Sequence, residues 1–221
     1  MRWESFQEKG QLFAVSAFYK SFSNPIELVA FSEVAPDNIT PRNVGDATVL
    51  GVEIEVRKSL DFIDPSLSVG TNVTLVSSSV EFDTSPGGEL ESRTRNARPG
   101  EEIGETRQLQ GQSPFIINSY LNYALPDQSW EANLSYNVQG RRLAIVGISQ
   151  NPDVFEQPFH SLNAKVSRKL GEDQRMRINL SATNILNARF RQEYESFGAE
   201  NQTFAAYSPG TAFSLGLSYK L

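Results

Sequence analysis

Residues 211–221 read Thr-Ala-Phe-Ser-Leu-Gly-Leu-Ser-Tyr-Lys-Leu, so that apolar and polar side chains alternate. Successive side chains of a β-strand point to opposite faces of its sheet, so this order separates an apolar face from a polar one. The apolar set comprises Phe213, Leu215, Leu217, Tyr219 and Leu221. The stretch therefore predicts a strand whose two faces meet different surroundings.

The same period of two recurs along the chain. Six further segments alternate cleanly, and they are 48–60, 67–76, 115–125, 130–141, 161–170 and 176–183. The segment 11–22 alternates less regularly, and a short strand is expected at 2–7. The sequence thus predicts an all-β fold, an antiparallel meander of about nine long strands without a helix.

The predicted connections alternate strictly between short and long. The short ones are 8–10, 61–66, 126–129 and 171–174, and the long ones are roughly 23–45, 81–109, 147–158 and 188–209. Transmembrane β-barrels have short turns at one rim and long loops at the other, and their strands need about 9–11 residues. The pattern therefore predicts a curved segment of a transmembrane β-barrel.

Seven polar side chains of the predicted strands are candidates for the barrel interior. They are Glu53, Glu55, Arg57, Asn133, Asn137, Gln139 and Arg141. Such polar faces suit a water-filled or plugged lumen better than a packed core. Near the short turns, Tyr123, Trp130 and Tyr219 are expected to form an aromatic girdle at the membrane interface. The alternative on patterning alone is a soluble antiparallel sheet whose apolar faces form a shared core.

Composition excludes several classes of protein. The 221 residues carry 20 basic and 26 acidic side chains, a net charge of −6, and no basic stripe of the kind that binds nucleic acid. The absence of cysteine excludes disulfide scaffolds, thiolate metal ligands and thiol nucleophiles. No run of about 18 apolar residues predicts a transmembrane helix. The first ten residues lack the apolar core of a signal peptide, and the barrel pattern then favours a piece of a longer protein over a cytoplasmic one.

No catalytic, cofactor-binding or metal site is predicted. The single histidine, His160, has no histidine or cysteine partner for a metal, and no serine carries a nucleophile-elbow signature. Glu53 and Glu55 share a face with Arg57, so charge pairing is a better interpretation than acid–base catalysis. The segment 81–109 mixes carboxylates with arginines, and we expect a solvated loop there. Calcium binding by its carboxylates stays open, because their spacing matches no EF-hand loop.

Five motifs resemble segments of one family, the TonB-dependent outer-membrane receptors, and they occur in the family's order. The motifs are Gly10–Lys20 with Asn24-Pro25-Ile26-Glu27, Asn43-Val44-Gly45 with Gly51–Val56, Leu109–Phe115 with Asn118 and Leu121-Asn122-Tyr123, Thr183-Asn184-Ile185-Leu186-Asn187, and Pro209–Leu221. The last two resemble the penultimate strand motif and the closing strand.

The resemblance implies that residues 1–221 are the C-terminal segment of a receptor barrel, with the plug domain and earlier strands absent. Such barrels have about 22 strands, so the segment is not expected to close alone. The apolar residues of 211–221 would be the C-terminal assembly signal, although Leu221 stands where the family usually has an aromatic residue.

The resemblance also implies a function and partners. The protein would lie in the outer membrane of a Gram-negative bacterium, contact its lipid, and be inserted by the barrel assembly machinery. TonB would act through the missing N-terminal part and drive uptake of a bulky scarce nutrient, namely siderophore-bound iron, cobalamin or a glycan. The alternative is a small, self-closing outer-membrane barrel with a structural or adhesion role. Neither interpretation makes the chain an enzyme.

Overall fold

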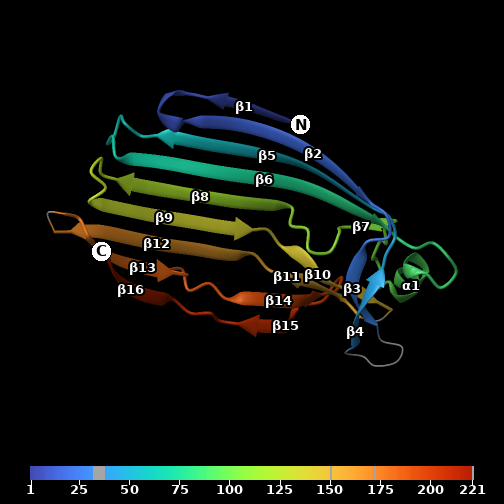
Figure 1. The fold of residues 1–221 in the computed structure, drawn as a ribbon. Helices are drawn as coiled ribbons and strands as arrows, with labels where there is room; N and C mark the ends of the chain where they lie inside the picture. Colours follow the sequence, from blue (N-terminus) through green and yellow to red (C-terminus); the bar gives the residue numbers. More distant parts are fainter. Residues whose placement is uncertain (32–37, 150, 172, 221) are drawn as a thin grey trace.

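The computed structural model describes residues 1–31, 38–149, 151–171 and 173–220. Two sheets make up most of the fold (Figure 1). The larger sheet holds ten strands, nine of which form a meander, and the smaller one is built from the long connections between them. The predicted all-β antiparallel meander is confirmed, and the larger sheet is open rather than closed into a barrel.

The nine strands of this meander lie side by side in chain order, each antiparallel to the next (Figure 1). They are β1 (Arg2–Phe6), β2 (Leu12–Phe22), β5 (Ala47–Ser59), β6 (Leu67–Glu81), β8 (Phe115–Ala124), β9 (Trp130–Gln139), β12 (Phe159–Leu170), β13 (Met176–Thr183) and β16 (Ala212–Tyr219). The short strand β7 (Thr106–Arg107) pairs with the end of β6. The predicted segments match these strands closely, but β6 is longer than predicted and β9 is shorter.

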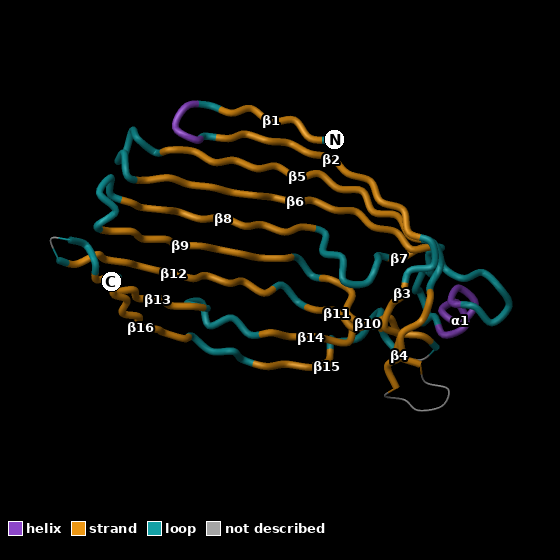
Figure 2. Tube along the Cα trace, in the orientation of Figure 1, coloured by secondary structure: helices purple, strands orange, loops and turns teal. Residues whose placement is uncertain are grey.

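The four short turns lie at one end of the larger sheet and the four long connections at the other (Figure 2). We call these the short-turn end and the long-connection end. The turn between β1 and β2 contains a single 3-10 turn, η1 (Glu8–Gly10). The predicted short and long connections therefore lie at opposite ends of the larger sheet.

The long connections are not simple loops, and this corrects the sequence-based prediction. They contain β3 (Ile26–Phe31), β4 (Asn38–Asn43), β10 (Arg142–Ile148), β11 (Asp153–Glu156), β14 (Phe190–Glu195) and β15 (Gln202–Tyr207). These strands form a six-stranded sheet in the order β15-β14-β11-β10-β3-β4, which we call the loop sheet. Its strands β3 and β10 are parallel and bring Val29 beside Val146.

Two further predictions, both for segment 81–109, are corrected by the structure. It contains a short helix, α1 (Glu89–Asn96), where no helix was expected. It is also not uniformly solvated, since the side chains of Glu89 and Arg107 are each 8% exposed. The predicted turn around Pro86 and Gly87 is present. Among the described residues, no helix is long and apolar enough to span a membrane.

The strand register separates two faces of the larger sheet. Directly paired residues share a face, and one such row across five strands is Val15, Ile54, Val73, Ile117 and Val138. We call this the apolar face. Its large side chains are exposed, with Leu50 at 58%, Leu180 at 54% and Leu215 at 73%. Continuous apolar surface of this kind is unusual in a protein surrounded by water and is what a bilayer would cover.

The aromatic residues Tyr123, Trp130 and Tyr219 lie on the apolar face beside short turns. Arg168 lies over the Trp130 ring, 4.9 Å from its centroid. The opposite face of the larger sheet, the polar face, carries mostly charged, amide and hydroxyl side chains. A buried cluster of Val29, Leu143 and Val146 instead lies in the loop sheet.

On β16, the predicted assembly signal is placed on the apolar face of an edge strand. Phe213, Leu215, Leu217 and Tyr219 point to that face, and all four are at least 60% exposed. Leu221 lies outside the described residues.

Candidate functional site

Three of the predicted lumen residues form a charged group on the polar face of β5. Glu55 pairs with Arg57 through Oε1 at 2.6 Å and with Arg2 of β1 through Oε2 at 2.8 Å. Glu53 accepts hydrogen bonds from Asn72 and, at 3.4 Å, from Ser16. These carboxylates are occupied by structural partners, which leaves neither positioned as a free acid or base.

The predicted asparagines form amide pairs across β8 and β9. Asn133 donates to Asn122, and Asn137 donates to Asn118, each at 2.5 Å. Both pairs are directly opposite in register, so they share the polar face with Glu53 and Glu55. Gln139, at the long-connection end of β9, donates to Glu156 of the loop sheet at 3.4 Å.

Arg141 is placed differently from the prediction. Strand β9 ends at Gln139, so Arg141 follows the strand instead of lying on its polar face. Its guanidinium pairs with Glu195 of β14 and lies 3.6 Å from the centroid of the Phe155 ring. The six other predicted lumen residues share one face, whereas Arg141 helps to hold the loop sheet together.

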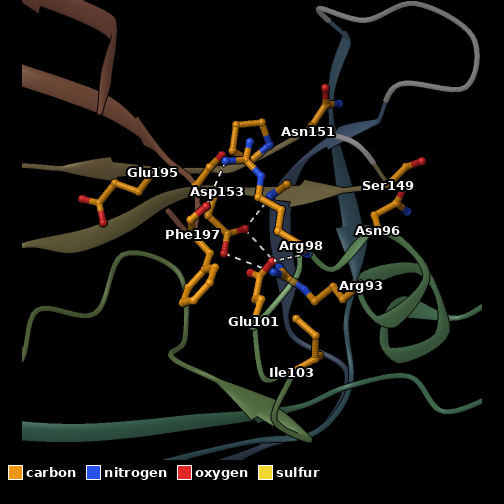
Figure 3. Close-up of a pocket in the computed structure, with 13 residues that line it drawn as sticks. Arg93, Asn96, Arg98, Glu101, Ile103, Ser149, Asn151, Asp153, Glu195 and Phe197 are labelled. Atoms are coloured by element: carbon orange, nitrogen blue, oxygen red, sulfur yellow. Dashed lines mark hydrogen bonds and ion pairs between the residues drawn. The ribbon is translucent and has the colours of Figure 1, made fainter. Parts of the chain in front are cut away.

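A pocket of about 220 Å³ opens in the loop sheet region (Figure 3). Three long connections line it: Arg93 and Arg98 come from α1 and the segment after it, Asn151 and Asp153 from the β10–β11 connection and β11, and Glu195 and Phe197 from β14 and beyond. None of these residues was predicted from the sequence to form a site. A pocket with such a polar lining is suited to binding a ligand by hydrogen bonds and charge.

Arg93 holds two of these connections together. Its terminal nitrogens donate to both oxygens of Asp153, at 3.0 and 3.2 Å, and its Nε donates to Glu89 at 3.0 Å. Burial lowers the pKa of the Arg93 guanidinium, but Asp153 and Glu89 outweigh that effect, and the pKa lies above its ordinary value. Asp153 in turn accepts a hydrogen bond from the backbone N–H of Gly147 at 2.8 Å.

The ion pairs continue away from the pocket through Arg107. It pairs with Glu89 at 2.9 Å and with Glu27 of β3 at 2.6 Å. Burial also lowers the pKa of Arg107, and the two glutamates again raise it above its ordinary value. Glu27, Arg107, Glu89, Arg93 and Asp153 thus form one chain of alternating charge, which we call the ion chain. It joins three long connections.

Two groups near the pocket remain suited to contact a ligand. Phe197 is 50% exposed, and the Asn151 side-chain nitrogen is buried without a hydrogen-bond partner among the described residues. Arg98 donates to the backbone oxygen of Phe197 at 2.9 Å, which fixes the position of this aromatic residue (Figure 3). The arrangement offers an aromatic surface, an amide donor and fixed charges.

The histidine lies away from this pocket. His160 is on β12, on the apolar face, and its Nδ1 lies 2.7 Å from the Tyr136 hydroxyl. In the described parts of the chain, no three histidine, cysteine or acidic side chains are grouped as a metal site.

Comparisons with known proteins point to one family and one architecture. A family model described as "TonB dependent receptor-like, beta-barrel" matches residues 2–188. No curated protein matches the chain. A solved structure that resembles it is the crystal structure of the ferric yersiniabactin uptake receptor FyuA from Yersinia pestis, at 14% sequence identity and a TM-score of 0.51. The likeness covers 97% of this chain and 35% of that one, so this chain spans about a third of the receptor's length.

Proposed function

Because the chain belongs to the TonB-dependent receptor-like β-barrel family, we propose that residues 1–221 form the C-terminal segment of an outer-membrane receptor barrel. The plug domain and the remaining strands belong, in this proposal, to other parts of a longer protein. The continuous apolar face across nine strands is the observation that carries the proposal, since it fits the lipid of a Gram-negative outer membrane. The polar face, with Glu53 and Asn133, then lines the lumen.

The directions of the edge strands support a segment over a self-closing barrel. Eight successive antiparallel pairings separate β1 from β16, so both strands run towards the short-turn end. A seam between them would be parallel, whereas bacterial barrels are antiparallel throughout with an even number of strands. An odd number of further strands would restore that pattern.

The function that follows is energised uptake of a bulky scarce nutrient. Long loops of bacterial barrels face the exterior, so the loop sheet and its pocket would meet the arriving nutrient first. Siderophore-bound iron, cobalamin or a glycan are the candidate classes, and the structural neighbour, described as a ferric yersiniabactin uptake receptor, supports the first. TonB would supply the drive through the part of the protein outside this chain, and the barrel assembly machinery would insert the barrel.

A growth experiment tests this function. The gene for the full-length parent is disrupted, and the strain is grown with ferric siderophores, cobalamin or glycans in turn as the limiting source. We expect loss of growth on one class, and the same loss when TonB is inactivated. Unimpaired growth on every class, with the parent protein shown in the outer membrane of the undisrupted strain, would contradict the uptake function and favour a structural role.

Limited proteolysis tests the orientation. Trypsin added to intact cells should cut after Arg95, whose side chain is 70% exposed on α1, because exposed segments are the preferred cleavage sites. Arg93 and Arg107 are held in the ion chain and should resist, and Arg98 precedes Pro99, a bond that trypsin does not cleave. Cleavage after Arg95 only in permeabilised cells would show that the long connections face the periplasm, the reverse of the proposed orientation.

A further inference from the structure

The apolar face of the larger sheet carries positive charge at the short-turn end. Lys58 of β5 and Arg168 of β12 point to this face, and each lies within two residues of the strand end at a short turn. In the described strands, the acidic side chain on the same face is Glu81, at the opposite, long-connection end of β6. The apolar face is therefore bordered by cations at one end only.

The guanidinium of Arg168 has an aromatic partner but no anionic one. It lies over the ring of Trp130, which is directly opposite on β9, at 4.9 Å from the ring centroid. In the described chain, no acidic side chain lies within ion-pair distance of Arg168, and its N–H groups make no hydrogen bond. An aromatic ring attracts a cation without satisfying those donors. Because a charge on a lipid-facing surface is destabilising, an anion from outside the chain would stabilise this position.

A groove of about 440 Å³ lies on the apolar face beside Arg168. Ala164 and Ala182 are directly opposite each other on β12 and β13, and their small side chains leave a depression in the surface. Larger apolar side chains border it, namely Val166, Leu180, Phe213 and Leu215. Among the described residues, the lining includes no charged side chain, so the groove is suited to hydrocarbon.

The groove and the arginine follow each other along β12. On the apolar face, the residue after Arg168 in the direction of the long-connection end is Val166, and the next is Ala164. At about 3.4 Å per residue, these positions lie roughly 7 and 14 Å from Arg168. An anionic group on Arg168 would therefore place an attached hydrocarbon chain over Val166 and into the groove.

A phosphate joined to an acyl chain fits this arrangement. Guanidinium groups form paired hydrogen bonds with phosphate, and basic side chains at a membrane surface attract anionic lipids. Tyr219 lies one row nearer the short turns than Arg168, so the arginine is at the level of the aromatic girdle, where head groups meet hydrocarbon. A zwitterionic head group carries its own cation, which competes with Arg168 for the phosphate. An anionic phospholipid is therefore favoured.

We propose that Arg168 and the neighbouring groove bind one anionic phospholipid of the periplasmic leaflet, with its phosphate on the guanidinium and an acyl chain along Val166 and Ala164. The proposal rests on the proposed function, because it needs the apolar face to lie in a bilayer with the short turns on the periplasmic side. It goes beyond general contact with lipid, since it assigns a single site and the charge of its head group.

Native mass spectrometry of the full-length parent tests the site. The protein is transferred into micelles that contain equal amounts of phosphatidylglycerol and phosphatidylcholine with the same acyl chains, and the retained lipids are counted by mass. The parent should retain one more phosphatidylglycerol molecule than an Arg168→Gln variant, in which the affinity of the site should fall about tenfold. Lys58→Gln is the matched control, since it removes the other cation at the same end and should retain that molecule.

Filling the groove provides a second measurement that leaves the charge unchanged. Ala164→Leu should also lose the phosphatidylglycerol molecule, whereas Ala17→Leu, on the apolar face of β2, should keep it. Heat modifiability shows that each variant is folded. Equal retention by the parent, Arg168→Gln and Ala164→Leu, or equal retention of phosphatidylcholine at the site, would overturn the proposal. Absence of the parent from the outer membrane would instead refute the proposed function.

Discussion

At the scale of single residues, the stability of the loop sheet depends on Arg93 more than on its neighbours along α1. Arg93 is 19% exposed and contacts Glu89 and Asp153, whereas Arg95 is 70% exposed and pairs with Glu91 alone among the described residues. Removing a charge from a buried pair leaves its partners uncompensated, while exposed pairs contribute little. Two arginines two positions apart should therefore differ strongly in their effect.

We predict that Arg93→Met destabilises the loop sheet by about 3–5 kcal/mol, since Asp153 would lose its arginine partner and Glu89 would keep only Arg107 of its two. The matched variant Arg95→Met should cost no more than about 0.5 kcal/mol. Hydrogen exchange at the Gly147 amide, which donates to Asp153, measures the effect. Equal exchange rates in the two variants would show that the ion chain does not stabilise the loop sheet more than an exposed ion pair does.

The pairings within the ion chain could not be predicted from the sequence. Three connections, which the sequence predicts only as long loops, supply Glu27, Glu89, Arg107 and Asp153. Nothing in the spacing of a charged residue within its own loop indicates a partner in another. Charge pairing of Glu55 with Arg57 was predictable, because both lie on one strand and alternate residues share a face.

At the scale of the strand, the two faces were predictable because a bilayer imposes a period of two on every membrane strand. The C-terminal end of β9, however, could not be predicted from this alternation. Its alternation continues in the sequence to Arg141, but the strand ends at Gln139, and Gly140 lies against the Phe115 ring, where a Cβ atom would come within 2.8 Å. The end of the strand is therefore set by a contact with another strand.

A pair of neighbouring residues on β9 tests the faces. Leu134→Arg should destabilise the barrel by about 2–4 kcal/mol if this position lies near the bilayer midplane, because the guanidinium would meet hydrocarbon. Asn133→Arg should be milder, because Asn133 pairs with Asn122 on the polar face. Unfolding of the full-length parent in lipid, followed by heat modifiability, gives the comparison. Similar losses in both variants would refute the assignment of the apolar face to lipid.

The start of α1 should be sensitive to acid. The hydroxyl and N–H of Ser85 lower the pKa of Asp83, and the backbone N–H of Gly87, followed by Arg95, lowers the pKa of Glu91. A carboxylate with a lowered pKa stabilises the fold above its ordinary pKa and loses that contribution as the pH falls. Amide exchange at Ser85 and Gly87 should therefore accelerate, after correction for the intrinsic rate, between about pH 5 and pH 3.

The variant Glu91→Gln serves as the control for this pH dependence. It should remove most of the acid effect at Gly87 and leave that at Ser85, because each amide donates to a different carboxylate, at 2.7 and 2.9 Å. Exchange at Gly87 that keeps its full acid dependence in this variant would contradict the role of Glu91.

At the scale of the whole molecule, the larger sheet was predictable and the loop sheet was not. Consecutive strands of the meander pair with each other, so the strand order in the larger sheet follows from the sequence. The loop sheet joins three separate connections, and its parallel pairing of Val29 with Val146 has no local signal. The pocket around Arg93 and Phe197 depends on that sheet, so it could not be predicted either.

Residues 1–221 expressed alone should not form a closed, monomeric barrel. In the described chain, β1 has β2 as its only neighbour in the sheet, and β16 has β13. Both edges thus carry unpaired backbone groups, and each such group costs several kcal/mol in lipid. Pairing the two edges with each other would require a parallel seam with β1, which has five residues. Refolding into detergent should therefore give aggregates or mixed oligomers, whereas the full-length parent should give one species. A monodisperse, heat-modifiable monomer with a clean β-sheet circular dichroism spectrum would show that the segment closes by itself and would favour the small-barrel alternative.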